Sequence, residues 1–504
     1  MRDNMKTPVE AVDEAKLPKE MNSRDSLKAG AWYTVSRVVL KGATMLLTPI
    51  YARLMTHAEY GFNTTIGSWF SIVSTVATGN LGAGLSRAKY EYPGKLDEFI
   101  SSITFLGTLI TLFFYCVIMA FSEFFCELFG CRIEFFHIVF GSLLISPALG
   151  YQQGKNRIDN KYRLVVFITI GSWLLSSAGN LLMLASTSFR EAIMGTEATD
   201  RILSMYVGSH FPSFVINLVV YVILVLRGRT LVNFKYWRYA LGMGLPLIPH
   251  ILAGYILNHS DRIMITNICG EEYTALYSIT YTCSAVVSML FNSLNEAWVP
   301  WFNDKYYFHR ENTIKRVTTI YYLLFFVMTL GMMLVGPELL MILGGRSYMP
   351  ALAIMPVVMA SCFFQFTNAF FVNIETYEKK TFYTSIGTLL AALINIGLNA
   401  WLLPKWGYVA AAYTTLIGFV FLFIYHYITT RRLIGTKVKE LYPVKMILAA
   451  LVFMLLLIYP MLLLYDHFAL RLLVGLACVG GAGWFVYRKR NMLLEMLKTF
   501  KRTN

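Results

Sequence analysis

Long apolar runs alternate with short polar segments along nearly the whole chain, from about residue 30 to residue 488. About 20 apolar residues form an α-helix long enough to cross the hydrocarbon core of a bilayer. Runs such as "MILAALVFMLLLIYPMLLL" (446–464) lack the two-residue alternation that a membrane β-barrel needs. The pattern therefore predicts an all-α polytopic membrane protein of about 14 transmembrane helices. Their centres lie near residues 42, 72, 109, 143, 174, 215, 250, 285, 325, 361, 391, 417, 453 and 477.

Composition excludes a soluble enzyme. The 504 residues are 56% hydrophobic and 14% charged, whereas soluble domains are about a quarter charged. No loop exceeds about 25 residues, which leaves no room for an extramembrane catalytic domain. The chain contains no phosphate-binding G-x-x-x-x-G-K-[ST], no H-E-x-x-H and no nucleophile elbow. We therefore expect a protein that is not an enzyme, with no cofactor and no metal.

Lysine and arginine gather in alternate segments between the apolar runs, and the net charge is +15. Residues 1–29 have no apolar signal-peptide core, so we expect a cytoplasmic tail there. The positive-inside rule then places the basic segments and both termini in the cytoplasm. The basic excess indicates topology and contact with anionic membrane lipids, not nucleic-acid binding. The basic segments are 87–95, 155–163, 227–238, 305–316, 379–380, 431–439 and 488–502.

A faint internal repeat divides the chain. "ARLMTHAEYGFNTTI" (52–66) and "TNICGEEYTALYSI" (266–279) each end one span, share Glu-Tyr and begin the next span, at an offset of 213 residues. Two pseudo-symmetric six-helix lobes are typical of transporters whose site lies between the repeats. The expected divisions are a cytoplasmic tail (1–29), an N-lobe with spans 1–6 (30–230), a C-lobe with spans 7–12 (236–432), spans 13 and 14 (443–488), and a basic cytoplasmic tail (489–504).

The first span carries a polar stripe. Thr34, Arg37, Lys41, Thr44 and Thr48 follow one another at spacings of three and four residues, which places them on one face of a helix. A cation inside a span costs about 2.5–3.5 kcal/mol on insertion scales. We interpret the stripe as lining a wet central cavity, where two cations would attract an anion. Snorkelling of the two side chains to the headgroups stays open as the alternative.

Five further polar residues lie inside apolar runs. Under the repeat alignment, His250 matches the cation at position 37, although a hydrogen-bonded core histidine would look the same. Asp261 and Arg262 are adjacent and point about 100° apart, so one can face the cavity while the other anchors the helix. Glu296, with Asn292 one turn before it, is the acid best placed to pair with the first-span cations. The candidate substrate-binding residues are therefore Arg37, Lys41, Thr44, Thr48, His250, Asp261, Arg262, Asn292 and Glu296.

Two other pairs have narrower interpretations. Asn395 and Asn399 lie one turn apart on the run near residue 391, where we expect them to hydrogen-bond between helices. Cys126 and Cys131 share an expected outer loop, and whether they form a disulfide stays open.

Four stretches resemble a known family. They are "LTPIYARLMTHAEYG" (47–61), "NHSDRIMITNICGEEYTALYSI" (258–279), "NSLNEAWVPWF" (292–302) and "NIGLNAWLLPKWGYVAAAYTTLIG" (395–418). With the span pattern, they make the chain similar to the polysaccharide flippases, of the O-antigen and capsule type, in the multidrug/oligosaccharidyl-lipid/polysaccharide exporter superfamily.

The resemblance implies two six-helix lobes that form a V around a central cavity and alternate between inward-open and outward-open states. The implied substrate is a polyprenyl-pyrophosphate-linked oligosaccharide, moved from the inner to the outer leaflet of the bacterial inner membrane during surface polysaccharide (O-antigen, lipopolysaccharide) biosynthesis. Arg37 and Lys41 would then neutralise the pyrophosphate. We expect a monomer, and association with a polysaccharide polymerase stays open.

Spans 13 and 14 depart from the commoner twelve-span form, and fourteen-span relatives include flippases of peptidoglycan precursors. A cation-coupled multidrug exporter of the same superfamily is the other alternative. It should carry acids in the cavity of the first lobe, where this chain carries bases. A membrane-bound polymerase or ligase would need a larger outer loop.

Overall fold

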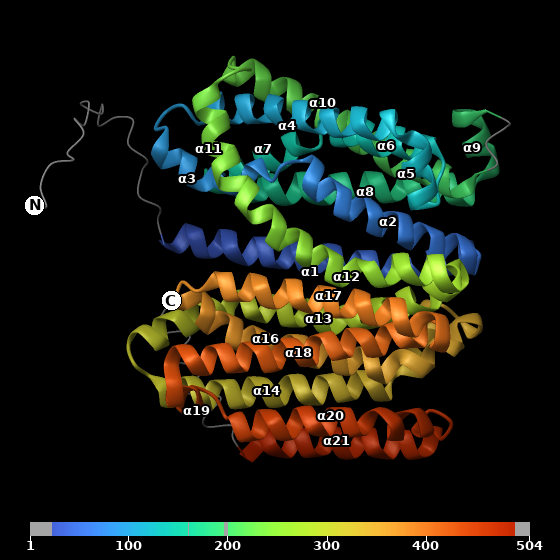
Figure 1. Ribbon diagram of the computed structural model, residues 1–504, viewed down its shortest axis with the longest axis vertical. Coiled ribbons are helices and arrows are strands. Elements are labelled where there is room, and N and C mark those ends of the chain that lie inside the picture. Colours follow the sequence, from blue (N-terminus) through green and yellow to red (C-terminus); the bar gives the residue numbers. More distant parts are fainter. Residues whose placement is uncertain (1–22, 160, 196–199, 489–504) are drawn as a thin grey trace, which may run out of the picture. The chain divides into compact units, whose positions relative to one another are not determined.

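The structure is a computed structural model that describes residues 23–159, 161–195 and 200–488 (Figure 1). Within these ranges, every regular element is a helix. The chain packs into two compact units. The first contains the described residues up to Leu40 together with Ile66–Tyr255, and the second contains Lys41–Thr65 together with the described residues from Ile256 onward. Three helices are divided between the units: α1 (Ser23–Leu54), α2 (His57–Ala77) and α12 (Ile248–Cys269).

The first unit is held together by close helix packing around α4 and α10. Phe99, Ile100 and Ile103 of α4 are fully buried in its core. The helices that lie wholly in this unit are α3 (Leu85–Glu91), α4 (Leu96–Ala120), α5 (Ser122–Phe129), α6 (Ile133–Leu143), α7 (Pro147–Ile158), α8 (Tyr162–Ala185), α9 (Thr187–Met194), α10 (Arg201–Gly228) and α11 (Phe234–Gly244), with 3-10 turns η2 (Leu81–Gly84) and η3 (Leu245–Leu247).

The second unit is built around α16, which contacts α13, α14, α18 and α20 and is buried along most of its length. An apolar helix that is buried all round lies in the centre of a bundle. The helices that lie wholly in the second unit are α13 (Glu271–Tyr307), α14 (Glu311–Leu334), α15 (Gly336–Leu343), α16 (Met355–Tyr377), α17 (Thr381–Trp406), α18 (Val409–Ile434), α19 (Val438–Leu441), α20 (Val444–Leu464) and α21 (Phe468–Arg488), with 3-10 segments η4 (Arg346–Ile354) and η5 (Gly435–Lys437).

The all-α membrane fold is confirmed. Within the described ranges, ten helices are long and apolar enough to cross a membrane, or eleven if the bent pair Phe234–Leu247 and Ile251–Cys269 forms one span. Each of the 14 centres expected from the sequence falls inside a helix. The count of 14 membrane crossings stays a prediction.

Helices α8 and α10 touch through two glycines. A Cβ on Gly208 would lie 2.3 Å from the carbonyl oxygen of Gly179, and a Cβ on Gly179 would lie 2.1 Å from that of Gly208. Small residues at such crossings let the backbones of membrane helices approach closely. We therefore expect Gly208→Ala to force α8 and α10 apart.

The cost of this overpacking should be about 1–3 kcal/mol, measured as a lower thermal unfolding midpoint of the purified protein. Gly171→Ala on α8 is the matched control, because a Cβ at Gly171 meets no atom within 4 Å. Equal midpoints for the two variants would contradict the close contact.

Cys126 and Cys131 are both free thiols in the structure. Cys131 is buried, and this burial raises the pKa of its thiol to about 12. Burial also raises the pKa of Cys126. Because the thiolate is the reactive form of cysteine, a raised pKa lowers the reactivity of both thiols near neutral pH.

Candidate functional site

The polar stripe of the first span lies on one continuous helix, α1. Lys41 and Thr44 are exposed, so this part of the stripe is not packed into a core. Thr48 is buried and its hydroxyl donates to the carbonyl of Thr44 at 3.5 Å. Arg37 belongs to the same helix, but its side chain lies outside the described part of the structure.

The other candidates lie on α12 and α13. The structure has a 3-10 turn, η3, immediately before α12; Pro246 lies in this turn and Pro249 at the start of α12. His250 on α12 and Glu296 on α13 are helical, but their side chains are outside the described part. Asn292 is exposed on α13.

A polar cavity of about 320 Å³ lies inside the second unit. Helices α12, α13, α16 and α18 supply its walls. The cavity brings together Asp261, Arg262 and Asn292, three of the residues singled out from the sequence. Its other polar lining residues are Asn258, His259, Tyr281, Ser284, Ser288, Ser361, Gln365 and Thr415.

Arg262 presents a fixed guanidinium at this cavity. Its Nε donates to the hydroxyl of Ser278 at 3.2 Å, and its Nη1 donates to the carbonyl of Asn258 at 2.9 Å. The guanidinium also lies over the rings of Tyr277 and Tyr281, at 6.0 and 5.5 Å from the centroids. A guanidinium has five N–H donors, so these two bonds leave donors that can hold an anion.

Asp261 is the centre of a buried polar cluster. The side chain is 2% exposed. Its carboxylate accepts hydrogen bonds from the Tyr277 hydroxyl at 2.5 Å, from the Thr415 hydroxyl at 2.6 Å and from the Asn399 amide at 2.6 Å. These partners lie on α13, α18 and α17, so one carboxylate joins four helices.

The asparagines on α17 extend this cluster. The Asn395 amide oxygen accepts from the hydroxyl of Ser260 on α12 at 3.4 Å, and its nitrogen donates to the hydroxyl of Thr415 on α18 at 3.2 Å. The expected role of Asn395 and Asn399 as interhelical hydrogen-bonding groups is therefore confirmed. Carboxylate, amide and hydroxyl oxygens are also the ligands that hard cations prefer, although the described residues contain no group of three or more His, Cys, Asp or Glu side chains that could hold a metal.

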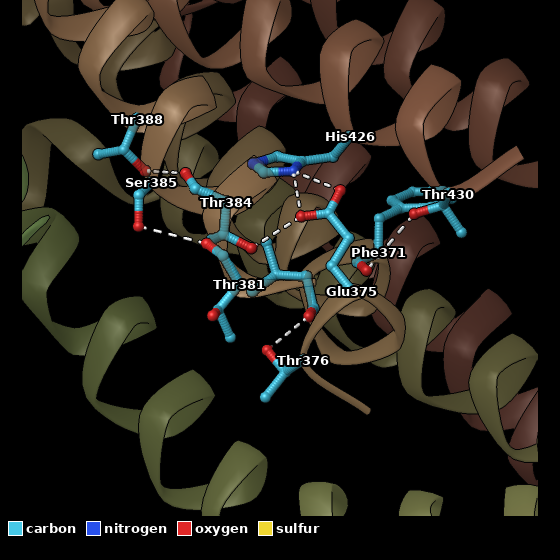
Figure 2. A network of polar contacts seen from close by, with 10 residues as sticks. Phe371, Glu375, Thr376, Thr381, Thr384, Ser385, Thr388, His426 and Thr430 are labelled. Carbon is cyan, nitrogen blue, oxygen red and sulfur yellow. Dashed lines mark hydrogen bonds and ion pairs between the residues drawn. The ribbon is translucent and has the colours of Figure 1, made fainter. Parts of the chain in front are cut away.

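Sequence reasoning missed a second buried cluster, which Figure 2 shows. Glu375 lies near the end of α16, His426 lies on α18 and Thr384 lies on α17. His426 Nδ1 lies 2.9 and 3.1 Å from the two carboxylate oxygens of Glu375, and the Thr384 hydroxyl donates to one of them at 2.8 Å. Glu375 is 0% exposed. The available signal was an acid and a histidine inside apolar runs, four and five residues before basic pairs.

We expect this cluster to stabilise the second unit. Glu375→Ala would leave the His426 ring and the Thr384 hydroxyl without their buried partner, which costs about 1–3 kcal/mol for each unsatisfied group. The measurement is the thermal unfolding midpoint, with Glu440→Ala, which removes an exposed carboxylate of the same unit, as the control. If Glu375→Ala unfolds at the wild-type temperature, as the control should, the cluster does not stabilise the second unit.

The comparison with known families is consistent with this architecture. Residues 26–305, more than half of the chain, match the family described as "Polysaccharide biosynthesis protein". The chain belongs to this family. An uncharacterized membrane protein of Methanocaldococcus jannaschii, MJ1068, is 22% identical over 441 residues, which cover 79% of this chain and 83% of that protein.

Comparison with solved structures identifies the fold of this chain. The lipid II flippase MurJ, in an inward closed conformation, superposes with a TM-score of 0.63 at 14% identity and covers 93% of this chain and 100% of its own. A multidrug resistance MATE family transporter of the MOP superfamily, in an inward-facing conformation, has a TM-score of 0.58 at 12% identity and covers 83% and 99%. The protein thus has the fold of the MOP superfamily, and the resemblance found in the sequence is confirmed.

Proposed function

We propose that this protein is a flippase that moves polyprenyl-pyrophosphate-linked oligosaccharide from the inner to the outer leaflet of the bacterial cytoplasmic membrane. The N-lobe (30–230) and C-lobe (236–432) would move so that the substrate has access alternately to the two sides of the membrane. The observation that carries the proposal is the pair of cations on the first span, Arg37 and Lys41. Membership of the polysaccharide biosynthesis family supports a lipid-linked sugar as the substrate class.

The chemistry of the two cations suits a pyrophosphate. Arginine binds phosphate through the two prongs of its guanidinium, and lysine acts as a point charge. The exposure of Lys41 and Thr44 supports a stripe that is available to a ligand. Arg262, whose guanidinium is fixed at the C-lobe cavity, would supply a further contact for the anion. The sugar would lie in the cavity while the lipid tail stays in the bilayer.

The membrane potential can contribute to the direction of transport. With both termini in the cytoplasm, export moves two negative charges out of a cell whose interior is negative. This gains about 4–5 kcal/mol per 100 mV if no other charge moves. Export driven in this way would not require a motor that hydrolyses a nucleotide.

A flippase for peptidoglycan precursors is the second candidate, because the MurJ fold neighbour is a lipid II flippase. Depletion of the protein from its native host separates the two. We expect polyprenyl-linked oligosaccharide to accumulate on the inner leaflet and surface polysaccharide to fall, while cell-wall synthesis continues. Accumulation of a peptidoglycan precursor would instead favour the second candidate, and accumulation of neither would contradict both. Re-expression of the wild-type chain is the control.

A further inference from the structure

A groove on the second unit combines apolar walls with an ion pair whose arginine is buried. Its volume is about 400 Å³, within the range of small-molecule sites. Val327, Gly331 and Leu334 of α14 form one wall, and Leu472, Gly475 and Leu476 of α21 form the other. These two helices contact each other in the bundle. Leu472 and Leu476 are exposed, so the groove is open to the surface.

One ion pair lies near one end of this groove. Arg471 Nη2 donates to Glu338 Oε1 at 2.5 Å. Arg471 is 6% exposed, yet its Nη1 is buried and has no hydrogen-bond partner. Glu338 is partly exposed and lies on α15, just after the end of α14. A buried guanidinium with an unused donor in an otherwise apolar membrane-protein groove is expensive, and such residues are usually functional.

The groove has polar residues near one end and apolar residues along the rest of its length. Arg471 is in the first turn of α21, and Glu338 is in the first turn of α15, four residues after the end of α14, so the pair lies at helix ends, where lipid headgroups are found. From Leu334 back to Val327, the wall runs about 10 Å along α14, since an α-helix rises 1.5 Å per residue. This arrangement matches a lipid with its headgroup at the pair and a chain along the groove.

We propose that this groove binds a phospholipid whose headgroup carries both a phosphate and a primary ammonium, as in phosphatidylethanolamine. The guanidinium of Arg471 donates to the phosphate, Glu338 accepts from the ammonium, and an acyl chain lies between α14 and α21. The charges decide the class of lipid. A lipid with net negative charge meets the carboxylate of Glu338, and a choline headgroup has no N–H to donate to it. The site is separate from the transport residues and does not depend on the proposed substrate.

Native mass spectrometry of the purified full-length protein tests this proposal. The protein is offered equal amounts of phosphatidylethanolamine, phosphatidylcholine and phosphatidylglycerol with identical acyl chains. We expect phosphatidylethanolamine to be retained about tenfold over the others, which corresponds to about 1.4 kcal/mol. Equal retention of the three lipids overturns the proposal. So does preference for phosphatidylglycerol, or displacement of phosphatidylethanolamine by equimolar polyprenyl pyrophosphate.

Three variants locate the binding. Glu338→Gln should remove the preference for phosphatidylethanolamine over phosphatidylglycerol, and Arg471→Gln should remove retention of all three lipids. Gly475→Leu should reduce retention about tenfold with the ion pair intact, because a Cβ at Gly475 meets only Leu334 Cδ1, at 4.0 Å, and the larger side chain would fill the groove.

Lys405→Gln is the matched control, since Lys405 is a cation of the same unit that lies over the Trp401 ring, 4.6 Å from its centroid, and outside the groove. If Arg471→Gln fails to fold, Glu338→Gln and Gly475→Leu still decide. Wild-type lipid retention in both of these variants overturns the proposal.

Discussion

Replacing Arg37 and Lys41 together with glutamine is expected to reduce export of the lipid-linked oligosaccharide by more than about a hundredfold. A hydrogen bond to a charged group contributes about 1.5–3 kcal/mol, and the double variant removes two cations that we propose to bind the pyrophosphate. Each single variant should retain part of the activity. The readout is oligosaccharide trapped on the inner leaflet of the native host, at matched protein levels.

The positive charge of the side chain at position 41, and not its size, should determine whether export continues. Lys41→Arg keeps the cation and should preserve export, while Lys405→Gln removes a cation elsewhere and should have no effect. Unchanged export in the double variant would mean that the stripe is explained by snorkelling or packing. The pyrophosphate would then bind at another cation, for which Arg262 at the C-lobe cavity is the best candidate.

The largest loss of stability is expected from Asp261→Ala. Three donors, from Tyr277, Thr415 and Asn399, would lose their acceptor inside the bundle. Each buried donor left unsatisfied costs about 1–3 kcal/mol, so we expect a total of roughly 3–5 kcal/mol, well above a typical substitution. The measurement is the thermal unfolding midpoint of the purified protein.

Two further variants separate the cause. Asp261→Asn keeps one acceptor oxygen and should lie between wild type and Asp261→Ala. Asp466→Ala removes an exposed carboxylate from the same unit and should leave the midpoint unchanged. If Asp261→Ala unfolds at the wild-type temperature, the four helices are not joined through this carboxylate.

The apolar runs made the helices predictable, because each run must be long enough to cross a bilayer. They also marked Asp261, Asn395 and Asn399 as polar groups in apolar surroundings. The sequence could not show that Asp261 and Asn399, which are 138 residues apart, share a hydrogen bond. Pairing between distant helices depends on how they pack, and the pattern of residues along one helix does not determine which helix packs against it.

The position of a residue within an apolar run does not show whether its side chain is buried. Arg471 belongs to one of the sparsely charged outer segments of the sequence pattern, whereas the structure buries its side chain. Glu375 lies close to the basic residues that end its run, and the same is true of His426, yet both are buried against each other. Near a helix end, the sequence does not distinguish a residue that faces headgroups from one that faces a neighbouring helix.

Translocation by the purified protein in liposomes tests the central proposal most directly. Polyprenyl-pyrophosphate-linked oligosaccharide is loaded on one leaflet, and its arrival on the other is followed with and without a membrane potential. We predict that the wild-type chain transports the lipid and that a membrane potential opposing movement of the anion slows this transport. The Arg37→Gln, Lys41→Gln double variant should not transport it. Transport equal to that of protein-free liposomes, or equal transport of a lipid-linked sugar without phosphate, would contradict the proposed function.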